Sequence, residues 1–304
     1  MEHAQVLIAG GGIGGLSAAV WCQRLGLSCL LVEKTDRLGG QLAQIRNEIV
    51  DFPPRVYPRG AELLEEMLLH PALGALSPRL EEAVLSIDPL SQIVTTTKAV
   101  YQADYLIIAT GVSPNVIPVL EGCPRVLSTE FSTTVQAASV TGQDIAVIGG
   151  GDRALESASN LSQFARRVDL LVRSSTLRAR SEWAERLAEL PNLRVFWGTE
   201  IASFEPQKEK IALKLRPLHV GQPSEIVVDW ILPRIGVHGN SGDFPSLATF
   251  GDGYLKTDEF QRTGYGWIYA LGDVSNGASY ASLSLAVGQA MKAVKHISLQ
   301  IHHS

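Results

Sequence analysis

Cysteine is scarce in this chain of 304 residues, which has thiols only at Cys22, Cys29 and Cys123. Three cysteines are too few for the disulfide framework of a small secreted protein. Cys22 and Cys29 lie in apolar segments, where the expected role is that of a small buried side chain. Cys123 is expected in a surface connection, where a reactive thiol is the alternative to a structural one.

Long apolar runs and basic blocks are also missing. Hydrophobic residues make up 45% of the chain, yet no apolar run reaches the roughly 18 residues needed to cross a bilayer, so we expect no membrane span. The N-terminal residues carry no basic segment, which predicts no signal peptide and a cytoplasmic location. A net charge of −5 without a long basic block argues against nucleic acid as the main partner. The length predicts two domains, at roughly 150 residues per domain.

The opening stretch combines an apolar strand, a glycine turn and the start of a helix. Residues 6–9 run into Gly10-x-Gly12-x-x-Gly15, the spacing of a dinucleotide-binding turn. In such turns the first glycine permits the tight bend, the second lets the backbone approach a pyrophosphate, and the third lets helix and strand pack closely. About 20 residues later a second apolar strand ends in Glu33, whose carboxylate can accept the ribose hydroxyls. This context favours a dinucleotide site over a glycine turn that merely starts a helix.

Two further segments of the first half carry small residues beside apolar ones. Gly39-Gly40-Gln41-Leu42 forms a loop in which paired glycines let the backbone approach a phosphate or a flavin. An apolar strand that begins at Tyr105 ends in Ala109-Thr110-Gly111. Between them, the periodicity predicts a helix from Gly60 to His70 and a β-meander with strands over 83–87 and 92–97.

A second strand, glycine turn and helix follow at residues 145–156. The fingerprint is Gly149-x-Gly151-x-x-Ala154, and two such units in one chain predict two nucleotide sites. The next strand ends in Arg173 rather than in an acid, with Arg178 and Arg180 close behind. Arginine suits a 2′-phosphate because its guanidinium bonds phosphate oxygens in pairs. The site therefore favours NADPH over NADH, the alternative being that these arginines only form a solvated edge.

The last third of the chain completes both domains. A helix is expected over 181–189 and strands near 193–197, 211–218 and 225–232. A return connection over 236–245 leads to a strand that ends in Gly272-Asp273, before a helix over about 282–300. Asp273 is placed to bond a ribityl hydroxyl of a flavin, the alternative being an aspartate that caps the helix.

Taken in order, these motifs resemble the low-molecular-weight thioredoxin reductase family of pyridine-nucleotide flavoenzymes, across nearly the whole chain. The resemblance implies an α/β fold with two Rossmann-like, three-layer ββα dinucleotide-binding domains, each with a parallel sheet plus a β-meander. Residues 1–115 and 244–304 would form a discontinuous FAD-binding domain, and residues 116–243 an inserted NAD(P)H-type domain. A homodimer is also implied.

The same resemblance assigns residues to two cofactor sites. FAD is expected in the first site and NADPH in the second, where a second FAD is the alternative. The residues expected at FAD are Gly10, Gly12, Gly14, Gly15, Glu33, Lys34, Gly40, Gln41, Leu42, Asp51, Ala109, Thr110, Gly111, Gly272, Asp273 and Ser282. Those expected at the second dinucleotide are Gly149, Gly151, Asp152, Arg153, Ala154, Arg173 and Arg178.

The sequence departs from the family at the redox centre. In the family a Cys-x-x-Cys pair precedes the first strand of the second domain, and the matching residues here, counted back from Gly149, are Ser132-Thr133-Thr134-Val135. A thiol relay needs a nucleophilic thiolate and a resolving partner, and neither Ser132 nor Val135 can supply one. No catalytic side chain is therefore expected, because the flavin carries the chemistry.

Smaller departures concern ligand contacts. The family's basic motif for a 2′-phosphate, His-Arg-Arg followed by Arg, appears here as Val172-Arg173-Ser174 and Arg178. Near the flavin ring, Tyr280-Ala281-Ser282 replaces Tyr-Arg-Gln, and Asp51 stands where the family usually has asparagine. These changes predict an altered NADPH affinity, flavin potential and substrate access.

The leading functional hypothesis is an FAD-dependent oxidoreductase that passes electrons between a donor, NADPH or ferredoxin, and an acceptor that meets the flavin directly. Ferredoxin, a low-molecular-weight disulfide and a quinone are the candidate partners, and no metal site is predicted. Two alternatives stay open at this point. One is a protein of this type with another dinucleotide, even a second FAD, in the NADPH site, and the other is a non-catalytic flavin-binding redox sensor.

Overall fold

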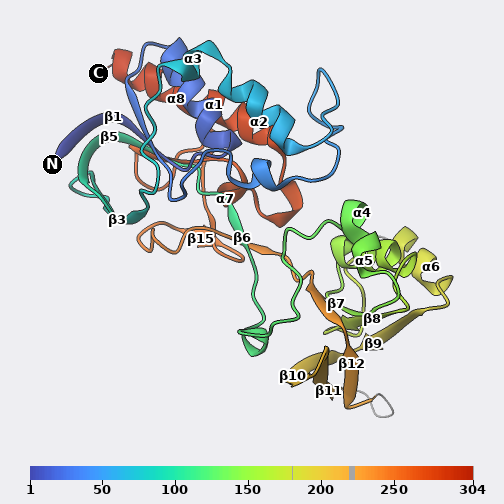
Figure 1. Cartoon of the computed structure of the whole chain (residues 1–304). Coiled ribbons are helices and arrows are strands. Elements are labelled where there is room, and N and C mark those ends of the chain that lie inside the picture. Colours follow the sequence, from blue (N-terminus) through green and yellow to red (C-terminus); the bar gives the residue numbers. More distant parts are fainter. Residues whose placement is uncertain (180, 219–222, 304) are drawn as a thin grey trace. The chain divides into compact units, whose positions relative to one another are not determined.

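The computed structural model describes residues 1–179, 181–218 and 223–303, and it divides into two compact units (Figure 1). Unit 1 contains Met1–Ser113 and Val237–Ser304, and unit 2 contains Pro114–Gly236. The chain returns to unit 1 earlier than the expected limit at residue 244. The reason is that β14 (Val237–Gly239) pairs with β6 (Val112–Pro114), and Phe244 packs in the core of unit 1.

A parallel sheet forms the centre of unit 1. Strand β1 (Glu2–Ala9) lies between β2 (Cys29–Val32) and β5 (Val100–Ile108). The first half of β5 pairs with β4 (Ile93–Thr96), which continues to β3 (Val84–Asp88) as the predicted β-meander. Its second half pairs with β17 (Ile268–Ala270), so a strand from the end of the chain completes the sheet.

The side chains of β1 point alternately into two hydrophobic cores, one on each face of this sheet. Because successive side chains of a strand point to opposite faces, Val6 and Ile8 face the helical layer while Leu7 and Ala9 face the β-meander. The helical layer consists mainly of α1 (Ile13–Arg24) and α8 (Leu283–His303), which lie together on one side of the sheet in Figure 1. Smaller elements complete unit 1: α2 (Gly60–Leu68), α3 (Pro71–Gly74), α7 (Asp273–Asn276), the 3-10 turns over Gly40–Gln44 and Ala278–Tyr280, β15 (Thr249–Phe250) and β16 (Tyr254–Leu255).

Unit 2 repeats the plan with a separate antiparallel layer. Its parallel sheet has the order β13 (Trp230–Pro233), β7 (Asp144–Ile148), β8 (Arg167–Val172) and β9 (Leu193–Trp197). One face carries α5 (Asp152–Ser162) and α6 (Ser181–Ala188). The other face packs on β10 (Thr199–Gln207), β11 (Lys210–Pro217) and β12 (Glu225–Val228). A short helix α4 (Thr133–Gln136) and 3-10 turns over Pro118–Leu120 and Ala137–Val140 precede β7. The predicted fold class, two three-layer ββα domains, is confirmed.

One expected strand of unit 2 was wrong in detail, and one strand was missed. The single strand expected over 225–232 is two strands, β12 and β13, which belong to different sheets. Asp229 divides them, because its backbone N–H donates to the carbonyl of Asp144 and its carboxylate accepts the N–H of Asp144. Strand β10 was not predicted, because its exposed polar residues give a weak alternation.

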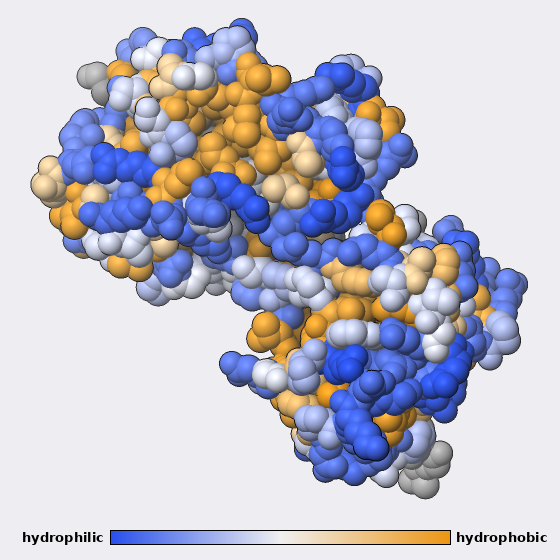
Figure 2. All heavy atoms as spheres, viewed as in Figure 1, coloured by the Kyte–Doolittle hydropathy of each residue, from blue (hydrophilic) through white to orange (hydrophobic). Residues whose placement is uncertain are grey.

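Hydrophobic residues also reach the surface of unit 1. On the face drawn in Figure 2 they gather over the region that Figure 1 labels α1, α2 and α8. The exposed fraction of the side chain is 77% for Leu69, just after α2, and 39% for Leu285 in α8. An exposed apolar patch on a domain indicates an interaction surface.

A network of ion pairs lies at the start of β7 and along β8 in the parallel sheet of unit 2. Asp144 is 2% exposed and accepts a hydrogen bond of 2.8 Å from Nε of Arg166 and one of 3.3 Å from Nζ of Lys210. Beside it, the fully buried Asp169 accepts bonds of 2.7 and 2.9 Å from Arg194. The Arg166 guanidinium holds the pKa of Asp144 below its ordinary value, against the effect of burial. Asp144 is therefore expected to stabilise unit 2 in its ionised form.

Replacing Asp144 with alanine is expected to lower the free energy of unfolding of unit 2 by about 2 kcal/mol at pH 7, because charge-assisted bonds to a buried anion are lost. The folded-state pKa of Asp144 is depressed, so its contribution is present above the unfolded value of about 3.9 and is lost as the pH falls through the folded value. Urea unfolding at pH 7 and pH 3 measures both effects. The exposed pair Lys214 and Glu225 supplies the control, since Glu225→Gln should cost no more than about 1 kcal/mol. An equal loss for both variants would contradict the expectation.

Candidate functional site

The first glycine turn leaves an open face at the start of α1. Gly10 has φ +111°, and a Cβ placed there would lie 2.4 Å from the carbonyl oxygen of Ala109. A Cβ at Gly15 would lie 1.9 Å from the carbonyl oxygen of Gly10, so helix and strand pack as closely as the motif predicts. A Cβ at Gly12 would meet no atom within 4 Å. Gly12 is also the N-cap of α1, with no side-chain cap and no acid in the first turn, so the helix dipole favours an anion here.

Glu33 is held beside this turn at the end of β2. Glu33 is 6% exposed, and its Oε2 accepts a 2.6 Å hydrogen bond from the N–H of Gly11. Oε1 accepts from the N–H and the hydroxyl of Thr35, both at 2.9 Å. Each carboxylate oxygen can accept more than one bond, so acceptor capacity is left for ribose hydroxyls. Lys34, the next residue of the predicted set, is exposed.

The paired-glycine loop folds onto the first turn. The N–H of Gly39 donates to the carbonyl of Gly11 at 2.8 Å, and a Cβ at Gly40 would lie 3.3 Å from Cα of Gly12. Gln41 Nε2 donates to the carbonyl of Val112 at 2.9 Å. Leu42 is buried in a small cluster with Ile13 and the start of α2. Loop and turn thus form one wall around the open face at Gly12.

The end of β5 is fixed by a residue that the sequence did not single out. Asn240 Nδ2 donates to the carbonyl of Thr110 at 2.8 Å, while the Thr110 hydroxyl donates to the carbonyl of Asn240 at 2.9 Å. The N–H of Asn240 also donates to the carbonyl of Gly111, which has φ +66°. Ala109 joins the turn through its N–H, which bonds the carbonyl of Ala9. Only the polar composition of residues 236–245 hinted at this role for Asn240.

Asp273 follows β17 and begins α7. Burial raises the pKa of its carboxyl, and the N–H of Ser282 donates to it with the opposite effect. The side chain of Ser282 caps α8 by accepting the N–H of Leu285, so Asp273 is not the cap of that helix. Gly272, at φ +72°, donates its N–H to Oε1 of Gln289 at 2.8 Å, which orients the turn before Asp273. Gln289 is a second residue that sequence reasoning missed.

Of the residues expected near the start of α8, the structure brings some into contact and leaves others exposed. The hydroxyl of Ser284 donates to the carbonyl of Asp51 at 3.1 Å, so the loop of Asp51 lies against the first turn of α8. Tyr280, in the segment that departs from the family motif, is 72% exposed. The position of Gly14 is close-packed, because a Cβ there would lie 2.7 Å from Cδ1 of Leu271. Asp51 contacts Ser284 through its backbone carbonyl rather than through its carboxylate.

The second glycine turn has the same open face in unit 2. Gly149 has φ +144°, and a Cβ there would lie 2.3 Å from the carbonyl oxygen of Arg234 and 3.0 Å from Cβ of Ala154. Gly151 is the N-cap of α5 without a side-chain cap, and a Cβ on it would meet no atom within 4 Å. Asp152 occupies the first turn, and Arg153 is exposed beside it. The two fingerprints therefore share one geometry.

The arginines after β8 lie beside this second turn. Arg173 and Arg178 are exposed, and the N–H of Arg178 donates to the carbonyl of Gly150 at 2.8 Å. The loop between them thus folds against the glycine turn, with both guanidiniums in solvent reach. The third arginine of the expected cluster, Arg180, lies outside the described residues.

The segment expected at the family's cysteine positions is a capped helical turn. Ser132 is 8% exposed, and its hydroxyl accepts the N–H of Val135 at 3.3 Å, which begins α4. Val135 is 62% exposed. Arg234, missed by sequence reasoning, donates to the carbonyl of Phe131 and, through Nε, to the hydroxyl of Ser157 at 3.1 Å. Burial, followed by repulsion from Arg153, lowers the pKa of Arg234 to about 10.

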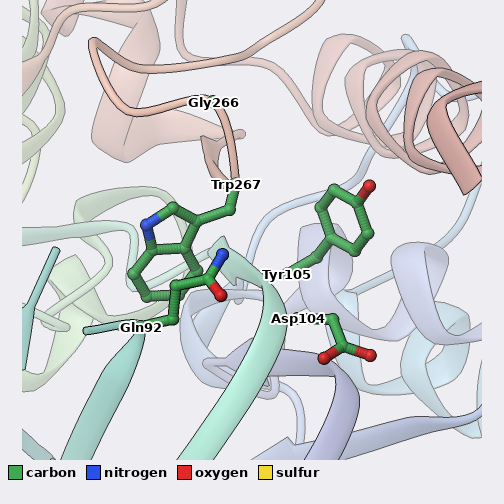
Figure 3. Close-up of a pocket in the computed structure, with 5 residues that line it drawn as sticks. All are labelled: Gln92, Asp104, Tyr105, Gly266 and Trp267. Carbon is green, nitrogen blue, oxygen red and sulfur yellow. The ribbon is translucent and has the colours of Figure 1, made fainter. Parts of the chain in front are cut away.

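A surface pocket of about 490 Å³ lies elsewhere on unit 1 (Figure 3). It is lined by Gln92, Asp104, Tyr105, Gly266 and Trp267. Asp104 and Tyr105 lie in β5, Gly266 and Trp267 precede β17, and Gln92 precedes β4. None of the predicted site residues lines the pocket. Among the residues that the structure describes, no group of three or more metal-ligating side chains forms a metal site, and no helix is long and apolar enough to span a membrane.

Comparison with known proteins gives a consistent result. Residues 4–296 match the family described as pyridine nucleotide-disulphide oxidoreductase. A thioredoxin reductase of Streptomyces coelicolor is 31% identical over 281 residues, covering 88% of this chain and 85% of the relative. The fold is similar to that of the thioredoxin reductase of Lactococcus lactis, with a TM-score of 0.79, 24% identity and coverage of 99% and 100% of the two chains. It is also similar to the bacillithiol disulfide reductase of Bacillus cereus, with a TM-score of 0.80, 19% identity and coverage of 98% and 100%.

Proposed function

Because this chain belongs to the pyridine nucleotide-disulphide oxidoreductase family, we propose that it passes electrons from NADPH through FAD to an acceptor that meets the flavin directly. The chain is a flavin-dependent oxidoreductase, and FAD and NADPH are the cofactors that its family supports. One observation carries the proposal: both N-cap glycines, Gly12 and Gly151, face space that no atom of the described chain fills within 4 Å. This open space at both turns supports the binding of two dinucleotides of the expected kind.

In unit 1 the described residues would hold FAD by three kinds of contact. The start of α1 would receive the pyrophosphate, because its N–H groups have no capping side chain. Glu33 would accept ribose hydroxyls beside Gly11. Asp273 would bond the ribityl chain, and partial burial raises the pKa of its carboxyl. When bound, FAD supplies the two-electron chemistry.

In unit 2 the start of α5 would receive the phosphates of NADPH. Arg173 and Arg178 extend from the loop that folds against Gly150, and their charge suits a 2′-phosphate. Both side chains are exposed in this structure, so a bound phosphate would have direct access to them. This arrangement supports NADPH rather than NADH as the donor.

The acceptor is proposed to approach the flavin itself because the relay positions hold no thiol. Ser132 is committed to capping α4, and Val135 has no redox chemistry. The acceptor classes compatible with this arrangement are a low-molecular-weight disulfide, a quinone and ferredoxin. The proposal does not include the reduction of thioredoxin through a dithiol of this chain.

An anaerobic titration tests the donor and the role of the flavin together. The purified protein is titrated with NADPH, NADH and reduced ferredoxin while the flavin absorbance is recorded. We expect NADPH to bleach the flavin absorbance. Adding an acceptor of one of the three classes named above should restore the absorbance, and this cycle should repeat. A protein that releases no flavin on denaturation, or whose flavin is not bleached by NADPH, would contradict the proposal. A ratio near two flavins per chain would instead place a second FAD in unit 2.

A homodimer is proposed from the apolar surface of unit 1. Leu69, just after α2, and Leu285 in α8 are exposed apolar side chains. Figure 2 shows hydrophobic residues gathered over the region that Figure 1 labels α1, α2 and α8. Burying such a patch against a second copy would remove it from water. A cytoplasmic location stays a prediction from the sequence.

A further inference from the structure

The second glycine turn lies at the point where the strand order of unit 2 reverses. From β7 the chain continues to β8 and β9 on one side of the sheet, and it returns as β13 on the other side of β7. In open α/β sheets a ligand binds outside the carboxyl ends of the strands at such a reversal. The ligand of unit 2 is therefore expected across the ends of β7 and β13.

Arg234 is the first residue after the carboxyl end of β13. Its N–H donates to the carbonyl of Ile148 at 2.7 Å, and its carbonyl oxygen is the atom that a Cβ at Gly149 would approach to 2.3 Å. Its side chain reaches α5, where Nε donates to the hydroxyl of Ser157 at 3.1 Å. Ser157 is five residues after the start of α5 at Asp152, about 7.5 Å along the helix axis. The guanidinium is therefore held between the end of β13 and the first two turns of α5.

The guanidinium of Arg234 has no anionic partner among the residues that the structure describes. Besides Ser157, it donates to the carbonyls of Phe131, Thr129 and Pro233, the last two at 3.5 and 3.3 Å. The aspartates at β7 and β8 form ion pairs with other basic residues, but in the described part of unit 2 no ion pair joins Arg234 to a carboxylate. The four hydrogen bonds use at most four of the five N–H groups of a guanidinium, so at least one is left for a ligand.

A half-buried cation without a counter-ion is unfavourable for the folded chain and attracts an anionic ligand. Burial, followed by repulsion from Arg153, lowers the pKa of Arg234 to about 10, so the guanidinium is still protonated at pH 7. Glu156 has a smaller, opposite effect. A phosphate group would compensate the two positive charges and accept the remaining N–H in a charge-assisted bond.

We propose that Arg234 binds the pyrophosphate of the dinucleotide at the second glycine turn, an inference that rests on the proposed binding of NADPH to unit 2. Arg173 and Arg178 follow β8 and would take the 2′-phosphate, so the adenosine half lies toward β8. From there the pyrophosphate crosses the start of α5 toward β13, the strand that Arg234 follows. Arg173 and Arg178 thus recognise the phosphate that only NADPH carries, and Arg234 recognises the pyrophosphate that NADPH and NADH share.

Nucleotide fragments test this division by equilibrium binding. Isothermal titration calorimetry of the flavin-bound, oxidised protein measures the dissociation constants of NADP⁺ and of 2′-AMP, which has the 2′-phosphate but no pyrophosphate. Arg234→Met should weaken NADP⁺ binding roughly 30-fold, because a charge-assisted contact to an anion is lost. Binding of 2′-AMP should change less than about twofold, because Arg173 and Arg178 still face its phosphate. Arg234→Lys keeps the charge and should bind NADP⁺ more tightly than Arg234→Met.

Arg125→Met is the matched control. The Arg125 side chain is half-buried over the ring of Trp230, 4.9 Å from its centroid, at the amino end of the same strand β13. Its removal leaves the carboxyl end of the strand unchanged, so the affinity for NADP⁺ should stay within about twofold of the parent. Steady-state kinetics give a second readout: Arg234→Met should raise the KM for NADPH and the KM for NADH by similar factors, since both nucleotides carry the pyrophosphate.

The binding constants distinguish failure of this proposal from failure of the proposed function. A parent protein that binds neither NADP⁺ nor 2′-AMP would contradict the NADPH site itself, and the role of Arg234 with it. If the parent binds NADP⁺, the role of Arg234 is overturned when Arg234→Met binds NADP⁺ as tightly as Arg125→Met does. It is also overturned when Arg234→Met loses affinity for NADP⁺ and 2′-AMP by the same factor, because a purely structural side chain would affect both ligands.

Discussion

Replacing Gly12 with valine is expected to give a folded protein that purifies without flavin. The backbone of Gly12 has φ −76° and ψ −174°, an extended conformation that valine adopts readily. A Cβ there meets no atom of the chain within 4 Å, so the fold should accept the change. The added methyl groups would fill the face through which a pyrophosphate approaches the start of α1. FAD binding should weaken at least 100-fold, which is about 2.7 kcal/mol.

The ratio of flavin absorbance to protein after purification measures this loss, and circular dichroism checks the fold. Gly74→Val is the matched control, because Gly74 lies in α3, is exposed, and a Cβ placed on it would also meet no atom within 4 Å. The control should keep its flavin. If Gly12→Val retained flavin to the same extent as the control, the first fingerprint would not be the pyrophosphate site.

Removing both arginines after β8 is expected to change the choice of nucleotide. In the double variant Arg173→Ala and Arg178→Ala, we expect the KM for NADPH to rise roughly 100-fold, about 2.7 kcal/mol, because two charge-assisted contacts to a 2′-phosphate are lost. The KM for NADH should change less than about twofold, since NADH has no such phosphate and the glycine turn is untouched.

Steady-state rates with each nucleotide at fixed acceptor measure this selectivity. Lys208→Ala provides the control, because Lys208 is an exposed cation of the same unit in the turn between β10 and β11. It removes one positive charge without touching the second glycine turn. Equal increases of KM for NADPH and NADH in the double variant would show that the arginines stabilise the loop rather than bind the phosphate.

The glycine turns were predictable because their chemistry is local. A strand, a glycine with positive φ and a helix start are set by a few neighbouring residues, and the structure shows this at Gly10 and again at Gly149. Helix α2 and strands β7 and β8 were predictable for the same reason. The spacing of apolar residues along each of them depends only on which faces of that one element are buried. The division between β12 and β13 was not predictable, because Asp229 acts through a partner, Asp144, far away in the chain.

The residues that hold the site in place depend on contacts across long sequence separations. Asn240 fixes Thr110, Gln289 orients Gly272, and Arg234 holds Phe131. A polar residue in a loop or on a helix face gives no periodic signal of its own. Its partner is set by how the strands and helices pack.

The sequence by itself determined the two dinucleotide fingerprints, the α/β class and the lack of a Cys-x-x-Cys pair, because each depends on residue identity at short spacing. Only the tertiary structure decided which side chains support those turns and where unit 2 begins and ends. These facts depend on a helix packing on a sheet and on strands from both ends of the chain pairing. Contacts of that kind are fixed by burial and hydrogen bonding in three dimensions, not by neighbouring residues.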